Sequence, residues 1–331
     1  MTSDPADAHY ERAAELFKQG DLDGAIAEYR EGLRISPGDP LAHLNIGNTF
    51  LRKGDRPSAI AEYREAVRLD PGHPLTHNNL ANALLRNGEL AEAIVEYREA
   101  LRLNLDLPST HNNLGNALFW TGDLDGAIIE YRATVALLPD YLPARCNLGN
   151  ALLAKGELDA AIVEYREVLA MKPDYPEAHF DLGNALARKN DLDGAITEFR
   201  EALRLVPDYP EAHYNLGNAL ATKNDRDAAV IEFREALRLR PDYAEAHYNL
   251  ASVLSDQGDV AGAIAEYREA SRLLPNDPNP YYHLGRVLML KGDYDEAIRE
   301  FEMAVQLKPD FVLADVELAR CKALKDRQAK P

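Results

Sequence analysis

The chain has 331 residues and a formal net charge of −18, with 55 acidic side chains against 37 basic ones. This charge argues against nucleic acid, whose binding needs a basic face, and it disfavours anionic membrane surfaces. A basic protein partner fits it better.

One unit of 34 residues repeats along almost the whole chain, and residues 176–209 show it most clearly. A proline recurs at the same place in eight units: Pro37, Pro71, Pro139, Pro173, Pro207, Pro241, Pro275 and Pro309. Leu105 stands where one proline is missing. A fixed period of this length is typical of a stacked array of short structural units.

Each unit carries two helix signals with a break between them. In the first half of residues 176–209, Ala178, Leu182 and Leu186 recur at helical spacing. Asn190 marks the break, at a position that is glycine in most other units, and both residues tolerate a left-handed helix cap. A second apolar helix follows and ends at Pro207. The pattern therefore predicts a pair of helices in every unit.

Small residues recur inside both predicted helices. Gly183 or an equivalent glycine or alanine lies in the first helix, and alanine matches Ala195 in every second helix. A glycine inside a helix costs about 1 kcal/mol relative to alanine. Its recurrence predicts that the two helices approach closely and that an aromatic side chain such as Phe199 fills the space beside it.

In chain order, we expect a short disordered lead (1–5) and then nine units. The units are 6–39, 40–73, 74–107, 108–141, 142–175, 176–209, 210–243, 244–277 and 278–311. The first unit has Arg12 where later units have Leu or Ile, as expected of a terminal repeat with a wetter end.

The last segment, 312–331, is predicted to form a capping helix and a short tail. The helix is expected to run from Val312 to about Asp326, with its packing side on Val316, Leu318 and Cys321. Its other side is charged, as a helix that closes an array requires.

At these positions the chain resembles the tetratricopeptide repeat (TPR) family. The matching residues in one unit are Leu182, Gly183, Leu186, Ala195, Phe199, Ala202 and Pro207. The resemblance covers all nine units and implies an all-α fold, a right-handed superhelical α-solenoid whose first helices line a concave groove. The chain departs from the family where a tryptophan is usual, because histidine stands there in six units: His43, His77, His111, His179, His213 and His247.

These histidines and His9 form a ladder for which we weigh two interpretations. Zinc needs nitrogen ligands about 2 Å away, whereas packed helices lie roughly 8–10 Å apart, so successive rungs cannot easily share an ion. We expect no metal site. The preferred interpretation is packing between helices in place of tryptophan, and the alternative is pH sensing.

Asparagines form two further rows on nearly the same face of the first helices. One row is Asn48, Asn82, Asn116, Asn150, Asn184 and Asn218, and the other, three residues earlier, is Asn45, Asn79, Asn113, Asn147, Asn215 and Asn249. An amide both donates and accepts hydrogen bonds, so such a row could hold the backbone of an extended peptide. The alternative is hydrogen bonding between neighbouring helices.

Aromatic residues add to the predicted groove. Phe180, Tyr214, Tyr248 and Tyr282 share a first-helix position, and Glu177, Glu211 and Glu245 lie about one turn earlier in three of these units. This combination suits a ligand with basic and apolar side chains. Phe119 and the single tryptophan, Trp120, interrupt a polar helix end and are either binding anchors or packing for the next unit.

We expect no enzyme activity and no cofactor, because the sequence has no phosphate loop, ligand cluster or nucleophile beside a base. The Asn-Leu-Gly-Asn runs also resemble the repeat region of O-linked N-acetylglucosamine transferase, whose catalytic region would need several hundred further residues.

The preferred function is a non-enzymatic scaffold that binds an extended peptide or protein segment in its groove. The alternatives are self-assembly through the array ends or through apolar patches such as Leu105, Leu107, Phe119 and Trp120, and targeting of a separately encoded enzyme. The N-terminal residues lack the apolar run of a signal peptide, and no segment predicts membrane insertion. Cys146 and Cys321 lie on distant units and are not expected to form a disulfide with each other. A cytoplasmic location is therefore expected.

Overall fold

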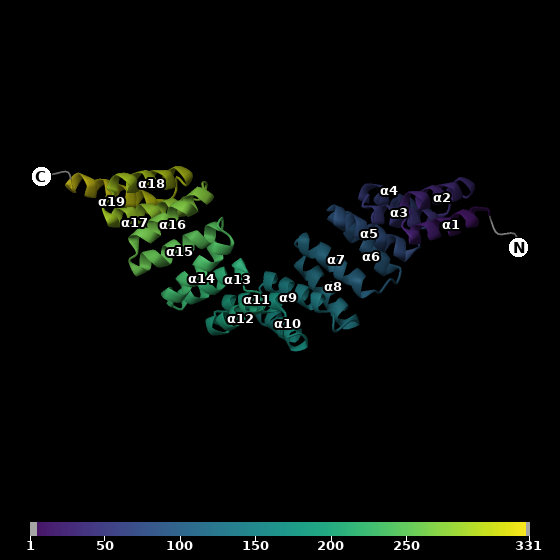
Figure 1. The fold of residues 1–331 in the computed structure, drawn as a ribbon, viewed down its shortest axis with the longest axis horizontal. Coiled ribbons are helices and arrows are strands. Elements are labelled where there is room, and N and C mark those ends of the chain that lie inside the picture. The colour runs from purple at the N-terminus through teal and green to yellow at the C-terminus, as the bar shows by residue number, and fades with distance from the viewer. Residues whose placement is uncertain (1–4, 329–331) are drawn as a thin grey trace. The chain divides into compact units, whose positions relative to one another are not determined.

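The computed structural model describes residues 5–328, which form helices and no strand (Figure 1). The first helices of the successive pairs are α1 (Pro5–Gln19), α3 (Pro40–Lys53), α5 (Pro74–Asn87), α7 (Pro108–Trp120), α9 (Leu142–Lys155), α11 (Pro176–Arg188), α13 (Pro210–Thr222), α15 (Ala244–Gln257) and α17 (Pro278–Lys291). The second helices are α2 (Leu22–Ile35), α4 (Arg56–Leu69), α6 (Leu90–Arg102), α8 (Leu124–Leu137), α10 (Leu158–Met171), α12 (Leu192–Leu205), α14 (Arg226–Leu239), α16 (Val260–Leu273) and α18 (Tyr294–Leu307). The last helix, α19 (Val312–Gln328), has no second helix after it among the described residues.

The chain divides into two compact units, Met1–Met171 and Lys172–Pro331. In the first unit consecutive helices from α1 to α10 pack on one another, and in the second unit consecutive helices from α11 to α19 do the same. First helices of adjacent pairs also touch, as α5 and α7 do. The predicted all-α array of paired helices with a final single helix is thereby confirmed.

The helix ends form where the sequence places them. At the start of α12, the Asp191 carboxylate accepts a hydrogen bond from the Gly194 backbone N–H at 3.1 Å, which caps the helix. At the end of α11, Asn190 adopts a left-handed conformation with φ 66°. Asn224 does the same with φ 65°, and in other repeats a glycine takes this role.

The close approach of the paired helices is also confirmed. A Cβ atom added to Gly183 would lie 2.6 Å from the Phe199 ring, so this ring occupies the space that a side chain would need. Ala195 on the facing helix is fully buried. The same contact recurs at Gly47, where the ring belongs to Tyr63. In these repeats an aromatic ring of the second helix therefore packs directly against a small residue of the first helix.

The two ends of the chain differ in part from the prediction. Residues 1–4 of the predicted disordered lead lie outside the described residues, while Pro5 already begins α1. Arg12 is exposed, as expected for the first repeat, and lies 3.4 Å from Glu28.

In α19, Cys321 is buried and Leu318 half-buried, as predicted, but Val316 is 57% exposed. The prediction for Val316 was wrong, because none of the described helices covers this side chain. At the equivalent place in the second repeat, Leu44 is only 5% exposed.

Candidate functional site

The two asparagine rows are hydrogen-bonded to each other between adjacent repeats, in both compact units. Asn147 Nδ2 on α9 donates to Asn116 Oδ1 on α7 at 3.2 Å. The same bond joins Asn79 to Asn48, Asn113 to Asn82, Asn215 to Asn184 and Asn249 to Asn218. Asn45 is exposed and begins its row. The rows therefore link neighbouring first helices, which is the structural alternative that the sequence left open.

Tyrosines of the second helices donate hydrogen bonds to four asparagines of the first row. The Tyr131 hydroxyl donates to Asn116 Oδ1 at 2.8 Å, and Tyr63, Tyr97 and Tyr165 do the same for Asn48, Asn82 and Asn150. The Asn116 oxygen thus accepts two hydrogen bonds, while its Nδ2 group has no hydrogen-bond partner among the described residues. The internal bonding therefore uses the amide oxygen and leaves the amide N–H groups as available donors.

A cavity of about 340 Å³ lies beside this network, and we call it the Trp120 pocket. It is lined by Asn116, Phe119 and Trp120 of α7, Tyr131 of α8, and Asn147 and Asn150 of α9. Trp120 is 62% exposed, so its ring is not consumed by packing inside the unit. The structure therefore brings together five of the sequence-predicted residues and adds Tyr131.

An equivalent cavity lies two repeats further along, in the second unit. Asn184, Ala187, Arg188, Phe199, Asn215 and Asn218 occupy the six corresponding positions around about 450 Å³ of space. Ala187 and Arg188 stand where the Trp120 pocket has Phe119 and Trp120. The two cavities therefore share their position in the repeat. Of the two, only the Trp120 pocket, in the fourth repeat, has an aromatic wall.

The other predicted aromatic residues pack between helices. The Tyr214 ring lies 6.0 Å from Phe233 and 4.8 Å from Tyr243. Phe180 packs in the same way on Phe199 and Tyr209, while Tyr248 packs on Tyr267 and His283.

Tyr282 is a correction to the predicted groove. It is only 8% exposed, between Phe301 and Phe311, and so offers little surface to a ligand. The rings of the second helix and of the loop that follows it cover the position that was predicted to face the groove.

Asp181 was missed by the sequence argument. It occupies the place of asparagine in the second row, and its only signal was the gap between Asn147 and Asn215. Burial, with a smaller contribution from the Glu177 charge, raises the pKa of Asp181 to about 7.

The described residues contain no cluster of His, Cys, Asp or Glu side chains that could hold a metal ion. Across residues 5–328, none of the helices has the length and apolar character needed to cross a membrane.

Stacked helix pairs with polar rows on the first helices define a helical repeat protein. Models described as TPR repeat match residues 13–54, 149–190 and 183–224, and models described as tetratricopeptide repeat match 44–108, 214–278 and 278–311. The chain belongs to the tetratricopeptide repeat family. This family is generally non-catalytic, and its members bind peptides or proteins.

Solved structures agree with this fold. The crystal structure of YrrB, described as a TPR protein with an unusual peptide-binding site, is 22% identical with a TM-score of 0.53, over 56% of this chain and 95% of that chain. The crystal structure of the APC/C hetero-tetramer Cut9–Hcn1 is 16% identical with a TM-score of 0.56, over 96% of this chain and 76% of that chain. No curated protein matches the chain significantly.

Proposed function

We propose that the chain is a non-enzymatic interaction scaffold that binds an extended protein segment along its first helices, with the Trp120 pocket as the anchor. The observation that carries this proposal is the exposed Trp120 beside a cavity with unsatisfied amide donors. Large aromatic residues next to a cavity are typical anchors at protein interfaces.

The polar groups of the pocket favour a peptide backbone as part of the ligand. Asn116 and Asn150 each offer an Nδ2 group, because their oxygens already accept hydrogen bonds from tyrosines. Asn147 uses its Nδ2 group on Asn112 and Asn116 and keeps its oxygen as an acceptor. Two donors and one acceptor match the C=O and N–H groups of an extended segment.

The aromatic wall of the Trp120 pocket and the net charge of the chain indicate which side chains the ligand carries. Phe119 and Trp120 suit an apolar side chain or a cation stacked on the ring. The net charge of −18 favours a segment with basic residues elsewhere.

The single tryptophan makes the test specific, because intrinsic tryptophan fluorescence reports on the pocket alone. Linear peptides selected from a random displayed library against the full chain are titrated while this emission is recorded. We expect apolar-basic sequences that change the emission on binding. Trp120→Phe lacks this emission, so the binding of the same peptides to this variant is measured by calorimetry.

Trp120→Ala is expected to weaken binding by about tenfold or more, as the loss of an anchor does. Ile129→Ala on α8 is the matched control, because Ile129 is also exposed but lies outside the pocket. Equal affinity for both variants would place the binding surface elsewhere and refute the proposal.

Self-association is a second candidate, and one observation favours it. Val312, Leu313 and Val316 of α19 are exposed together at the end of the array. Sedimentation would then show an apparent mass that rises with protein concentration in the native chain. The Val316→Lys variant would keep the mass of a monomer at every concentration.

A further inference from the structure

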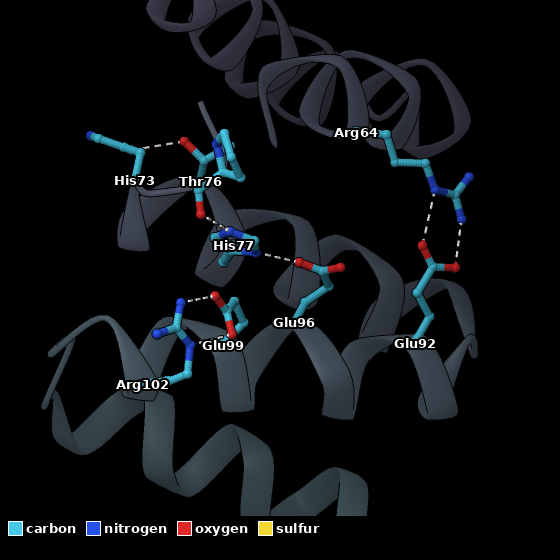
Figure 2. Close-up of polar contacts among 9 residues, drawn as sticks. Arg64, His73, Thr76, His77, Glu92, Glu96, Glu99 and Arg102 are labelled. Carbon is cyan, nitrogen blue, oxygen red and sulfur yellow. Dashed lines mark hydrogen bonds and ion pairs between the residues drawn. The ribbon is translucent and has the colours of Figure 1, made fainter. Parts of the chain in front are cut away.

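The ladder histidines join the two helices of their repeats through a hydrogen bond to a glutamate. His77 Nδ1 on α5 lies 2.5 Å from Glu96 Oε2 on α6, and the bond is visible in Figure 2. The same bond joins His9 to Glu28, His43 to Glu62, His111 to Glu130, His179 to Glu198, His213 to Glu232, and His247 to Glu266, at 2.5–2.7 Å.

The other ring nitrogen also faces an acceptor in most of these repeats. His77 Nε2 lies 3.0 Å from the Pro71 carbonyl oxygen in the preceding loop. His179, His213 and His247 contact Pro173, Pro207 and Pro241 in the same way, and His111 contacts the Asp106 carboxylate. A carbonyl oxygen only accepts hydrogen bonds, so Nε2 must carry a hydrogen, and an ionised glutamate demands one on Nδ1 as well. Only the imidazolium cation carries both.

The fifth repeat supports this reading with a residue whose charge is permanent. Arg145 stands in the place of the histidine. Its Nε donates to the Pro139 carbonyl at 3.0 Å and its Nη1 to Glu164 at 3.0 Å. Because arginine is always protonated, the site accepts a cation with two donors, and the same two acceptors receive them.

The ninth repeat shows what happens without the cation. Tyr281 takes the position, and its hydroxyl reaches the Pro275 carbonyl only at 3.4 Å. Burial, together with the charge of Glu296, raises the pKa of Glu300, the carboxyl left without a cationic partner at this position.

We propose that the sites at His213 and His247 are pH-dependent clamps, in which a protonated histidine ties both helices of a repeat to the loop before it and releases them when it loses its proton. The five sites with two acceptors, at His77, His111, His179, His213 and His247, share this geometry, and we call them the histidine clamps. The seventh and eighth repeats are then held most firmly on the acidic side of neutrality and loosen as the pH rises.

The groups around His213 agree with this direction. Glu232 and Glu235 of α14 face the ring, Glu235 pairs with Arg238, and the preceding loop contributes the Pro207 carbonyl and Asp208 near Arg238. Burial alone lowers the pKa of His213, but the hydrogen bonds to Glu232 and Pro207 and the two glutamate charges outweigh it and raise the pKa above its ordinary value. His247 has the same surroundings, with Glu266, Glu269 and the Pro241 carbonyl, and its pKa is also raised.

The sign of the effect follows from linkage. A histidine whose pKa is higher in the folded than in the unfolded chain contributes stability that is fully present below the unfolded pKa, near 6.5. That contribution disappears as the pH rises through the folded pKa of His213 and His247, above 6.5.

The direct test is nitrogen NMR of the full chain labelled with ¹⁵N-histidine, recorded from pH 5.5 to 9. We expect both ring nitrogens of His213 and His247 to keep their protons above pH 6.5, the ordinary pKa of histidine. Neutral rings at pH 6.5, with one protonated and one bare nitrogen, would overturn the proposal.

Two substitutions give a second readout. His213→Arg reproduces the fifth repeat and is expected to keep the stability of the native chain at pH 6 and to retain it at pH 8.5. His213→Gln should lower the folding equilibrium constant by about tenfold at pH 6, the worth of a hydrogen bond to a charged group, and match the native chain at pH 8.5.

His73→Gln is the control substitution, because the His73 ring hydrogen-bonds to Thr76 and lies outside the histidine clamps. If the arginine and glutamine variants lost stability equally at pH 6, the cation would not be what the site requires.

Discussion

At the scale of single residues, Asp181 and Trp120 mark two positions where the repeat pattern is broken. Both occupy positions that other repeats fill differently, asparagine for Asp181 and arginine for Trp120 at Arg52, Arg86 and Arg188. A half-buried carboxyl and an exposed indole each carry an energetic penalty that the fold does not require. Such departures are therefore the places to test first.

Asp181→Asn should stabilise the chain, and the gain should grow with pH. The folded pKa of about 7 lies above the ordinary value of 3.8, so the folded chain binds the proton more tightly than the unfolded chain does. Stability consequently falls as the pH rises through this window, and asparagine removes the loss. Urea unfolding at pH 5 and pH 8 measures the difference.

Asn215→Asp is the matched control, because it places a carboxyl in the same row where asparagine now donates to Asn184. It should lower stability at pH 8 more than at pH 5. A gain for Asp181→Asn that is the same at both pH values would contradict the argument.

At the scale of helices, periodicity predicts more of the fold than of the site. The period placed the helix pairs, and Gly183 predicted the close approach that the Phe199 ring confirms. It could not show that Phe311 covers Tyr282, because the covering ring comes from the loop that follows the second helix.

The asparagine rows had the same limitation. Their shared face was readable from spacing, but the second donor to the Asn116 oxygen is Tyr131 of another helix, which spacing along the first helices does not reveal. A repeat pattern tells which side chains share a face, and the three-dimensional neighbours decide which of their polar groups stay free.

Tyr281→Arg should install the missing clamp between α17 and α18. The arginine would supply Glu300 with a cation, as Arg145 supplies Glu164 at 3.0 Å. We expect a gain of up to about 1 kcal/mol in unfolding free energy, the range of a partly exposed ion pair. The gain should be larger at pH 8 than at pH 4, because only ionised Glu300 needs the partner.

Tyr281→Phe separates the charge from the loss of the hydroxyl. It removes the long contact with the Pro275 carbonyl and adds no cation, so its effect should be small at both pH values. Thermal unfolding of both variants at both pH values measures the difference. Equal stability of Tyr281→Arg and Tyr281→Phe would contradict the clamp.

At the scale of the whole molecule, stability should be distributed along the chain, because the helices within each unit pack mainly on their neighbours in sequence. In such an array, stability is approximately a sum of repeat and nearest-neighbour terms. A substitution in one of the two compact units should then leave a probe in the other little affected.

Leu114 and Leu250 provide this test, since both are almost fully buried and lie in different units. Leucine to alanine at such sites costs about 2–5 kcal/mol. Urea unfolding is followed by the fluorescence of Trp120, which lies in the first unit, and by circular dichroism, which reports on all helices. Leu114→Ala should lower the midpoint of the fluorescence transition. Leu250→Ala should mainly lower the midpoint of the circular dichroism transition and broaden that transition. If Leu250→Ala moved both transitions equally, the chain would unfold as one cooperative body, and local packing would not describe its energetics.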